Sequence, residues 1–211
     1  MMNKFPYLLY LVISEAGCFP NNFLSVTAQA IAGGVDIVQL REKWMPREKF
    51  LENALRLQEI LCKKSVPLII NDNLGIAQQV NAFGIHVGLT DVPPTQIRTI
   101  WPSSACIGYS IEALDQLYNA DTMAADYLGI SPVFKSNTKS DTTTEWGLAG
   151  IEKIRTLTSK PLIAIGNMNK SNVESVITSG ADCIAVVSAI CKADNPQKAA
   201  YQIKNEIEKA I

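Results

Sequence analysis

Long basic stretches, paired cysteines and membrane-length apolar runs are all missing from this sequence. Because no segment is dominated by lysine and arginine and the net charge is -1, nucleic acid and membranes are not expected partners. The five cysteines include no CxxC pair, and their odd number argues against a disulfide framework. The apolar run Tyr7–Ile13 is too short for a membrane span, and no cleavage-type sequence follows it. We therefore expect a cytoplasmic protein without a secretion signal.

What the sequence does contain is a repeated pattern, in which a short apolar, β-rich run precedes a longer helical stretch. The expected strands are Tyr7–Ser14, Ile37–Glu42, Pro67–Asp72, Ile85–Gly88, Cys106–Ser110, Tyr127–Val133, Pro161–Gly166 and Cys183–Ser188. The expected helices are Asn22–Ala32, Arg47–Lys63, Asn73–Ala82, Gly147–Leu157, Lys170–Ser179 and Pro196–Ile211, with Pro94–Ile100 and Ile111–Ala120 as weaker ones. Such alternation implies parallel strands. The sequence therefore predicts a single (β/α)8 TIM barrel over residues 1–211, with its site at the carboxyl ends of the strands.

Polar and apolar residues alternate along the second expected strand and just beyond it. Gln39, Arg41 and Lys43 share one face under a two-residue period, and the apolar residues between them share the other. Two cations in the barrel mouth would be costly without an anionic partner, so the pattern indicates an anion site. The alternative is a pair of surface charges neutralised by Glu42 and Glu48.

Carboxylates end the third and fourth expected strands. Asp72 follows an abrupt change from apolar residues to Asn71, and Asp91 follows the next strand. Two carboxylates at neighbouring strand ends suit one hard cation such as Mg²⁺. Taken alone, each aspartate is better explained as a helix cap, and the metal site is favoured only because the two occur together.

Hydroxyls and small residues follow the last three strands. The polar loop after strand six, Ser131–Asp141, suits either a phosphate lid or an ordinary flexible loop. Strands seven and eight end at Gly166 and Ser188, where many barrels bind a substrate phosphate through backbone N–H groups. This location indicates that a phosphate group binds here, but it does not identify the molecule that carries the phosphate.

The sequence has a single histidine, His86. It lies within an apolar strand, where structural packing explains it at least as well as catalysis does. We therefore expect no chemical role for it.

Seven segments of the chain resemble those of the thiamine phosphate synthase family. They are VQLREK (Val38–Lys43), IINDN (Ile69–Asn73), GIHVGLTD (Gly84–Asp91), IGYS (Ile107–Ser110), GISPVFKSNTK (Gly129–Lys139), AIGN (Ala164–Asn167) and AVVSAI (Ala185–Ile190). They run in the family's order from strand two to strand eight and cover nearly the whole chain. The combination of QLREK, a following ND and the PVFxSxTK loop is specific.

The resemblance implies that hydroxymethylpyrimidine diphosphate and thiazole phosphate are joined to give thiamine phosphate and pyrophosphate. In this family the carbon–oxygen bond to pyrophosphate breaks first, and the thiazole nitrogen captures the resulting carbocation. The protein's task is then to stabilise the departing pyrophosphate and to exclude water. No general base is required, which agrees with the reading of His86.

The resemblance also implies a role for each matching residue. Asp72 and Asp91 resemble the magnesium ligands. The residues that resemble the pyrimidine diphosphate contacts are Gln39, Arg41, Lys43, Asn71, Ser110 and Lys139, of which Arg41, Lys43, Ser110 and Lys139 are expected to be catalytic. Those that resemble the thiazole phosphate contacts are Ser136, Thr138, Gly166, Val187 and Ser188.

The chain departs from the family pattern at three positions. Leu89 stands where glutamine is usual, Asn167 where a second glycine is usual, and Ser136 where threonine is common. These departures leave room for lower activity or an altered thiazole preference. Whether the thiazole is carboxylated, and whether the protein is a homo-oligomer, stay open.

Two alternatives to the synthase remain. The sister thiazole tautomerase relies on a histidine just after the fifth strand, where this chain reads Ser110-Ile111-Glu112. The retained aspartates and Lys139 also favour the synthase. The other alternative is a non-catalytic barrel that binds thiamine precursors.

Overall fold

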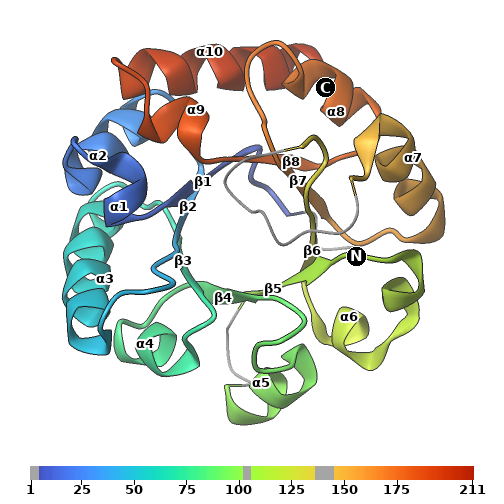
Figure 1. Cartoon of the computed structure of the whole chain (residues 1–211), viewed down its shortest axis with the longest axis horizontal. Coiled ribbons are helices and arrows are strands. Elements are labelled where there is room, and N and C mark those ends of the chain that lie inside the picture. The colour runs from blue at the N-terminus through green and yellow to red at the C-terminus, as the bar shows by residue number, and fades with distance from the viewer. Residues whose placement is uncertain (1–4, 102–105, 136–144) are drawn as a thin grey trace.

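Parallel strands close into a barrel in which each strand pairs with the next and β8 pairs with β1 (Figure 1). The structure is a computed structural model that describes residues 5–101, 106–135 and 145–211. The strands are β1 (Leu9–Ile13), β2 (Ile37–Leu40), β3 (Leu68–Asn71), β4 (Gly84–Val87), β5 (Cys106–Ile111), β6 (Tyr127–Ile130), β7 (Leu162–Ile165) and β8 (Cys183–Val186). The predicted (β/α)8 barrel is confirmed.

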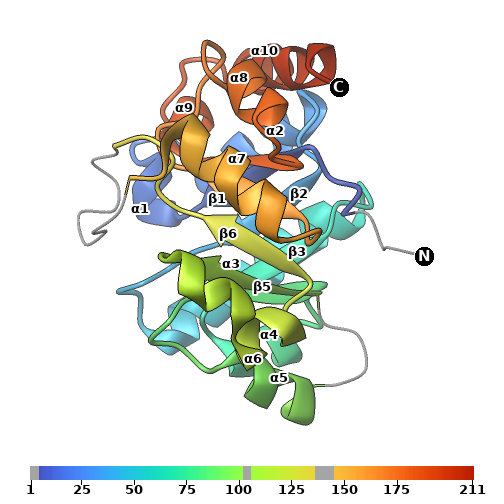
Figure 2. The ribbon, with the colours of Figure 1, turned by 90° about the vertical axis from the view of Figure 1, so that its right-hand side faces the viewer.

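Helices surround the strands as an outer ring (Figures 1 and 2). They are α1 (Glu15–Cys18), α2 (Phe23–Ala32), α3 (Arg47–Cys62), α4 (Leu74–Gln79), α5 (Pro94–Ile100), the 3-10 helix η1 (Leu114–Tyr118), α6 (Ala120–Ala124), α7 (Gly147–Leu157), α8 (Val173–Thr178), α9 (Ser188–Cys191) and α10 (Pro196–Lys209). None of the helices within the described ranges combines the length and apolarity needed to cross a membrane.

Side chains alternate between two apolar layers, as the two-residue period of a strand requires. One layer lies between the strands and the helices and includes Leu11, Val38 and Leu40. The other fills the barrel interior; it consists of Tyr10, Val12, Ile37, Ile69, Tyr127, Ile163, Cys183 and Ala185. The interior layer forms the floor beneath the mouth of the barrel.

The amino-terminal end of the barrel is held together by aspartates that precede β2, β6 and β8. The carboxylates of Asp36, Asp126 and Asp182 accept hydrogen bonds from backbone N–H groups of the preceding strands. Each also pairs with a lysine or arginine on a surrounding helix. These three carboxylates are therefore engaged in structural contacts at this end of the barrel.

Several of the sequence predictions were wrong in detail, and the strand expected over Tyr127–Val133 ends at Ile130. The expected helix Ile111–Ala120 is instead the end of β5, the separate helix η1 and the start of α6. The run expected to extend β8 to Ser188 ends at Val186, and Ser188 begins the short helix α9. An apolar run buried on all sides does not distinguish a strand from a short helix, so its pattern gave no sign of the change.

Candidate active site

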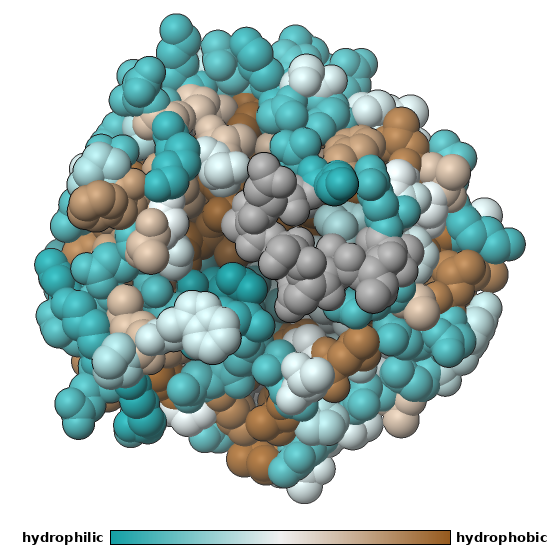
Figure 3. All heavy atoms as spheres, in the orientation of Figure 1, coloured by the Kyte–Doolittle hydropathy of each residue, from teal (hydrophilic) through white to brown (hydrophobic). Residues whose placement is uncertain are grey.

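A cavity of about 400 Å³ opens at the carboxyl ends of the strands. Figure 3 shows this face, where hydrophilic side chains lie beside the central hollow. The lining includes every predicted site residue that the structure describes: Gln39, Arg41, Lys43, Asn71, Asp72, Asp91, Ser110, Gly166, Val187 and Ser188. The remaining predictions, Ser136, Thr138 and Lys139, lie outside the described residues. Segments far apart in the sequence thus meet around one cavity.

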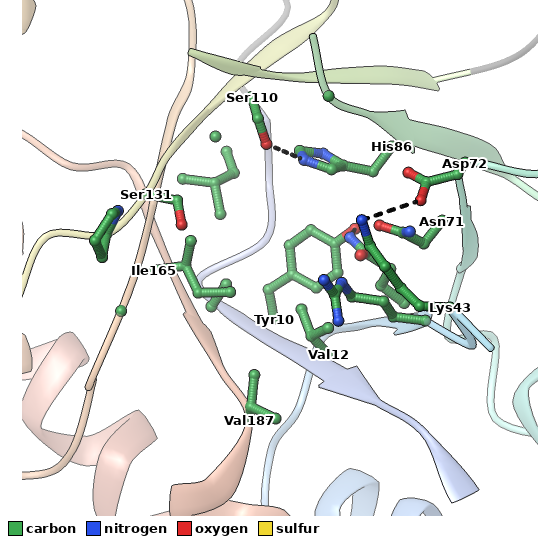
Figure 4. A pocket seen from close by; sticks show the side chains of 18 of the residues that line it. Tyr10, Val12, Lys43, Asn71, Asp72, His86, Ser110, Ser131, Ile165 and Val187 are labelled. Carbon is green, nitrogen blue, oxygen red and sulfur yellow. Dashed lines mark hydrogen bonds and ion pairs between the residues drawn. The ribbon is translucent and has the colours of Figure 1, made fainter. Parts of the chain in front are cut away.

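The polar row after β2 forms one wall of this cavity. Although the strand ends at Leu40, the backbone N–H of Arg41 still bonds to the carbonyl of Ile13, which continues the alternation past the strand end. Gln39 is buried, Arg41 is half-buried and Lys43 is more exposed. The Lys43 Nζ atom lies 3.9 Å from Asp72 Oδ2, so its ion pair is with a carboxylate of the cavity (Figure 4). The two cations therefore belong to the mouth of the barrel.

Neither aspartate of the cavity caps a helix. The side chain that caps α4 is Asn73, and α5 begins after Pro93 without a side-chain cap. The Asp91 carboxylate instead accepts a hydrogen bond from the Gly88 backbone N–H at 2.8 Å, which holds the loop after β4. The capping alternative is therefore wrong for both.

Asp72 has an unusual backbone and an unusual charge environment. Its φ of 61° lies in the left-handed region, which non-glycine residues rarely adopt and which often marks functional sites. Burial, the neighbouring Asp91 carboxyl and its charge raise the pKa of Asp72 from 3.8 to about 6, against the opposing effect of Lys43 and Arg41. Two carboxylates held this close favour a shared proton or a shared cation.

The other side of the cavity is built by the ends of β7 and β8. Gly166 and Asn167 both have positive φ, 118° and 53°. Asparagine is among the residues that tolerate the left-handed region best, which explains how it stands where the family usually has glycine. Next to them Val187 precedes α9 and Ser188 begins it, so backbone N–H groups of a first helical turn lie at this wall.

Replacing Gly166 by alanine is expected to destabilise the fold. A Cβ atom there would lie 2.7 Å from Pro132 Cβ and 2.9 Å from the Val133 backbone nitrogen, and the φ of 118° strains any side chain. We expect a loss of roughly 1–3 kcal/mol in the free energy of unfolding, measured by urea denaturation. Gly75→Ala is the matched control, because its Cβ would meet nothing nearer than 3.7 Å within a helix. Equal stability of the two variants would contradict this account.

The sequence reading missed a set of polar groups on the cavity floor. Tyr10, Tyr127 and His86 all line the cavity, and His86 Nε2 lies 2.9 Å from Ser110 Oγ. No chemical role is expected for His86 from the sequence, and in the structure it contacts Ser110, a predicted substrate residue. A tyrosine within a buried strand needs a hydrogen-bond partner, and that requirement was the available signal.

A closed barrel whose mouth combines cations, paired carboxylates and backbone N–H groups around a cavity defines a TIM-barrel protein with a site of the size of a small molecule. Comparison with known proteins narrows this class. The family model described as thiamine monophosphate synthase matches residues 9–190, and the chain belongs to that family of transferases.

Curated relatives and a solved structure agree with the family. A thiamine-phosphate synthase of Leptospira biflexa is 41% identical over 210 residues, covering 98% of this chain and 100% of its own. One from Albidiferax ferrireducens is 40% identical over 200 residues, covering 95% and 91%. The structure of a thiamine phosphate pyrophosphorylase from Pyrococcus furiosus superposes with a TM-score of 0.87 at 28% identity, covering 97% of each chain.

Proposed function

We propose that this protein is a thiamine-phosphate synthase, which joins hydroxymethylpyrimidine diphosphate to thiazole phosphate and releases pyrophosphate. One observation carries the proposal: every described residue that the family resemblance assigns to a substrate or metal lines the same cavity. Family membership and relatives of the same name over nearly the whole chain support it independently.

The pyrimidine diphosphate is assigned to the wall formed by β2, β3 and β5. Arg41 and Lys43 supply positive charge, and Arg41 presents a planar fork of donors suited to phosphate oxygens. Gln39 and Asn71, both buried, supply amide groups to the pyrimidine side, and Ser110 supplies a hydroxyl. Lys139, which lies outside the described residues, is proposed as a further contact of the leaving group.

Asp72 and Asp91 are proposed to hold Mg²⁺. The described residues contain no group of three or more His, Cys, Asp or Glu side chains that could hold a metal. Two carboxylates nevertheless fit Mg²⁺, which usually takes one or two of them and completes its shell with water and substrate phosphate. Burial and the neighbouring Asp91 carboxyl raise the pKa of Asp72 although Lys43 and Arg41 lower it, which supports a bound cation as the partner of this pair. When bound, the ion would neutralise charge on the diphosphate.

The thiazole phosphate is assigned to the wall formed by the ends of β7 and β8. Gly166 permits close backbone approach, and Val187 and Ser188 offer N–H groups and a hydroxyl at the start of α9. Ser136 and Thr138, outside the described residues, are proposed to add hydroxyls. The two phosphate-bearing groups would then face each other across the cavity.

The apolar residues between these walls suit a dissociative reaction. The carbon–oxygen bond to pyrophosphate breaks with its electron pair leaving on oxygen, and the thiazole nitrogen lone pair then forms the new carbon–nitrogen bond. No proton has to move. Val12, Ile165 and Val187 line the cavity beside the polar groups and would keep water from the carbocation (Figure 4).

The test is to incubate the protein with both phosphorylated precursors and Mg²⁺, and to follow thiamine phosphate by fluorescence after oxidation. We expect product only when both precursors are present. No product at high enzyme concentration would overturn the proposal. Isomerisation of the thiazole phosphate alone would instead support the tautomerase, and tight precursor binding without turnover would support the binding barrel.

A further inference from the structure

Four hydrogen bonds form an unbroken chain across the floor of the cavity. Gln39 Nε2 donates to the Tyr10 hydroxyl at 2.9 Å, and the Tyr10 and Tyr127 hydroxyls lie 3.1 Å apart. The Tyr127 hydroxyl lies 3.1 Å from His86 Nδ1. His86 Nε2 lies 2.9 Å from Ser110 Oγ, as Figure 4 shows. The chain thus links two predicted substrate contacts, Gln39 and Ser110, through three residues with no assigned role.

Two glycines make the room in which the histidine ring sits. A Cβ atom at Gly108 would lie 2.1 Å from the Tyr127 ring and 2.4 Å from His86 Nδ1. A Cβ atom at Gly129 would lie 2.9 Å from His86 Cε1. The His86 and Tyr127 rings stack with centroids 5.5 Å apart. The geometry of this contact is therefore built into the backbone of β5 and β6.

In this series of hydrogen bonds, the donor and the acceptor of each bond are set by where each hydroxyl proton can go. Because Gln39 donates to Tyr10, the Tyr10 proton goes to Tyr127, and the Tyr127 proton goes to His86 Nδ1. In the reverse direction Tyr10, which is only 1% exposed, would have no acceptor for its proton among the described residues. Burial raises the pKa of both tyrosines, so each keeps its proton at neutral pH.

We propose that Tyr10 and Tyr127 are positioning residues that hold His86 as the neutral tautomer with its proton on Nε2. In that tautomer His86 donates to Ser110 Oγ, and the Ser110 hydroxyl is left with its own proton to donate into the cavity. The cavity floor thereby presents a hydrogen-bond donor at Ser110, whereas in the other tautomer the Ser110 proton would go to His86 Nε2 and only lone pairs would face the cavity.

A hydrogen-bond donor at Ser110 suits the proposed release of pyrophosphate, and its use in catalysis rests on that proposed function. A donor at Ser110 would bind a diphosphate oxygen, and the bond would strengthen as negative charge grows on the leaving group. A lone pair in the same place would repel that oxygen. The tyrosines and His86 act through Ser110 and need not touch the substrate.

The single histidine makes the tautomer directly measurable. Untagged protein labelled with ¹⁵N-histidine gives one imidazole in a two-bond ¹H–¹⁵N correlation spectrum. We expect the wild type at neutral pH to show a protonated Nε2 and an unprotonated Nδ1. We expect Tyr127→Phe, which keeps the stacked ring and removes the hydroxyl, to lose that preference. A wild type protonated on Nδ1 would overturn the proposal even if the variant failed to fold.

Turnover provides the second measurement. Tyr127→Phe should lower kcat about tenfold while leaving the KM for thiazole phosphate unchanged. Tyr109→Phe is the matched control, because that buried tyrosine on the same barrel bonds Asn119 outside the cavity and should leave both values unchanged. An unchanged kcat in Tyr127→Phe would overturn the catalytic use of the chain. An inactive wild type would refute the proposed function instead, and the tautomer spectrum would still decide the proton positions.

Discussion

Asp72→Asn is expected to lower kcat/KM for thiamine phosphate formation by about 10²–10³-fold, because Asp72 is proposed to hold the metal that binds the departing diphosphate. Asparagine is the right replacement on structural grounds. It matches aspartate in size, and it tolerates the left-handed φ of 61° that alanine would strain. The variant therefore removes a charge and leaves the backbone as it is.

The same substitution should stabilise the metal-free protein. Because folding raises the pKa of Asp72 from 3.8 to about 6, the folded state favours the protonated carboxyl. The contribution of this group to stability is thus fully present below its ordinary pKa and is lost as the pH rises through about 6. At neutral pH Asp72→Asn removes that penalty, and we expect the melting temperature to rise by roughly 2–4 °C, equivalent to about 1 kcal/mol.

The matched control is Asp194→Asn, on the exposed loop between α9 and α10. It should change neither turnover nor the melting temperature. Calorimetry with and without Mg²⁺ measures the melting temperature. Mg²⁺ should raise the melting temperature of the wild type more than that of Asp72→Asn. A variant of Asp72 that keeps full magnesium-dependent turnover would show that the metal assignment is wrong.

Arg41→Met is expected to raise the KM for the pyrimidine diphosphate by about 10²-fold, since a charge-assisted contact to phosphate is lost in a half-buried site. Methionine keeps most of the apolar stem, so the variant tests charge more than packing. Arg41→Lys should recover only part of the loss, because lysine lacks the planar fork.

Steady-state kinetics with each substrate varied in turn checks this prediction. Arg56→Met is the control, because Arg56 lies on the outer face of α3 and pairs with Glu52 there. The KM for thiazole phosphate should change little in either variant. If Arg41→Met raised the KM for thiazole phosphate alone, the two substrates would have been assigned to the wrong walls.

Local patterns were enough to predict the barrel and most of its mouth. The alternation of Gln39, Arg41 and Lys43 is visible in the sequence, and the barrel geometry then directs all three into the cavity. Local sequence patterns could not decide whether Asp72 caps a helix or is available to bind a metal. It required knowing that the cap of α4 is the next residue, Asn73.

The hydrogen-bonded floor could not be predicted because it joins strands that are far apart in the sequence. Tyr10 and Tyr127 are separated by 117 positions, and His86 lies on a third strand between them. Each looks like an ordinary member of an apolar run. Only the closure of the barrel brings the Tyr127 hydroxyl within 3.1 Å of both the Tyr10 hydroxyl and His86 Nδ1.

The cavity is proposed to join two phosphorylated precursors and to release pyrophosphate. The most direct measurement quantifies thiamine phosphate and pyrophosphate in the same reaction mixture, with both precursors and with each alone. We expect equal amounts of the two products with both precursors and neither product with one. Pyrophosphate released without thiamine phosphate would show hydrolysis of the diphosphate in place of transfer, and would contradict the account.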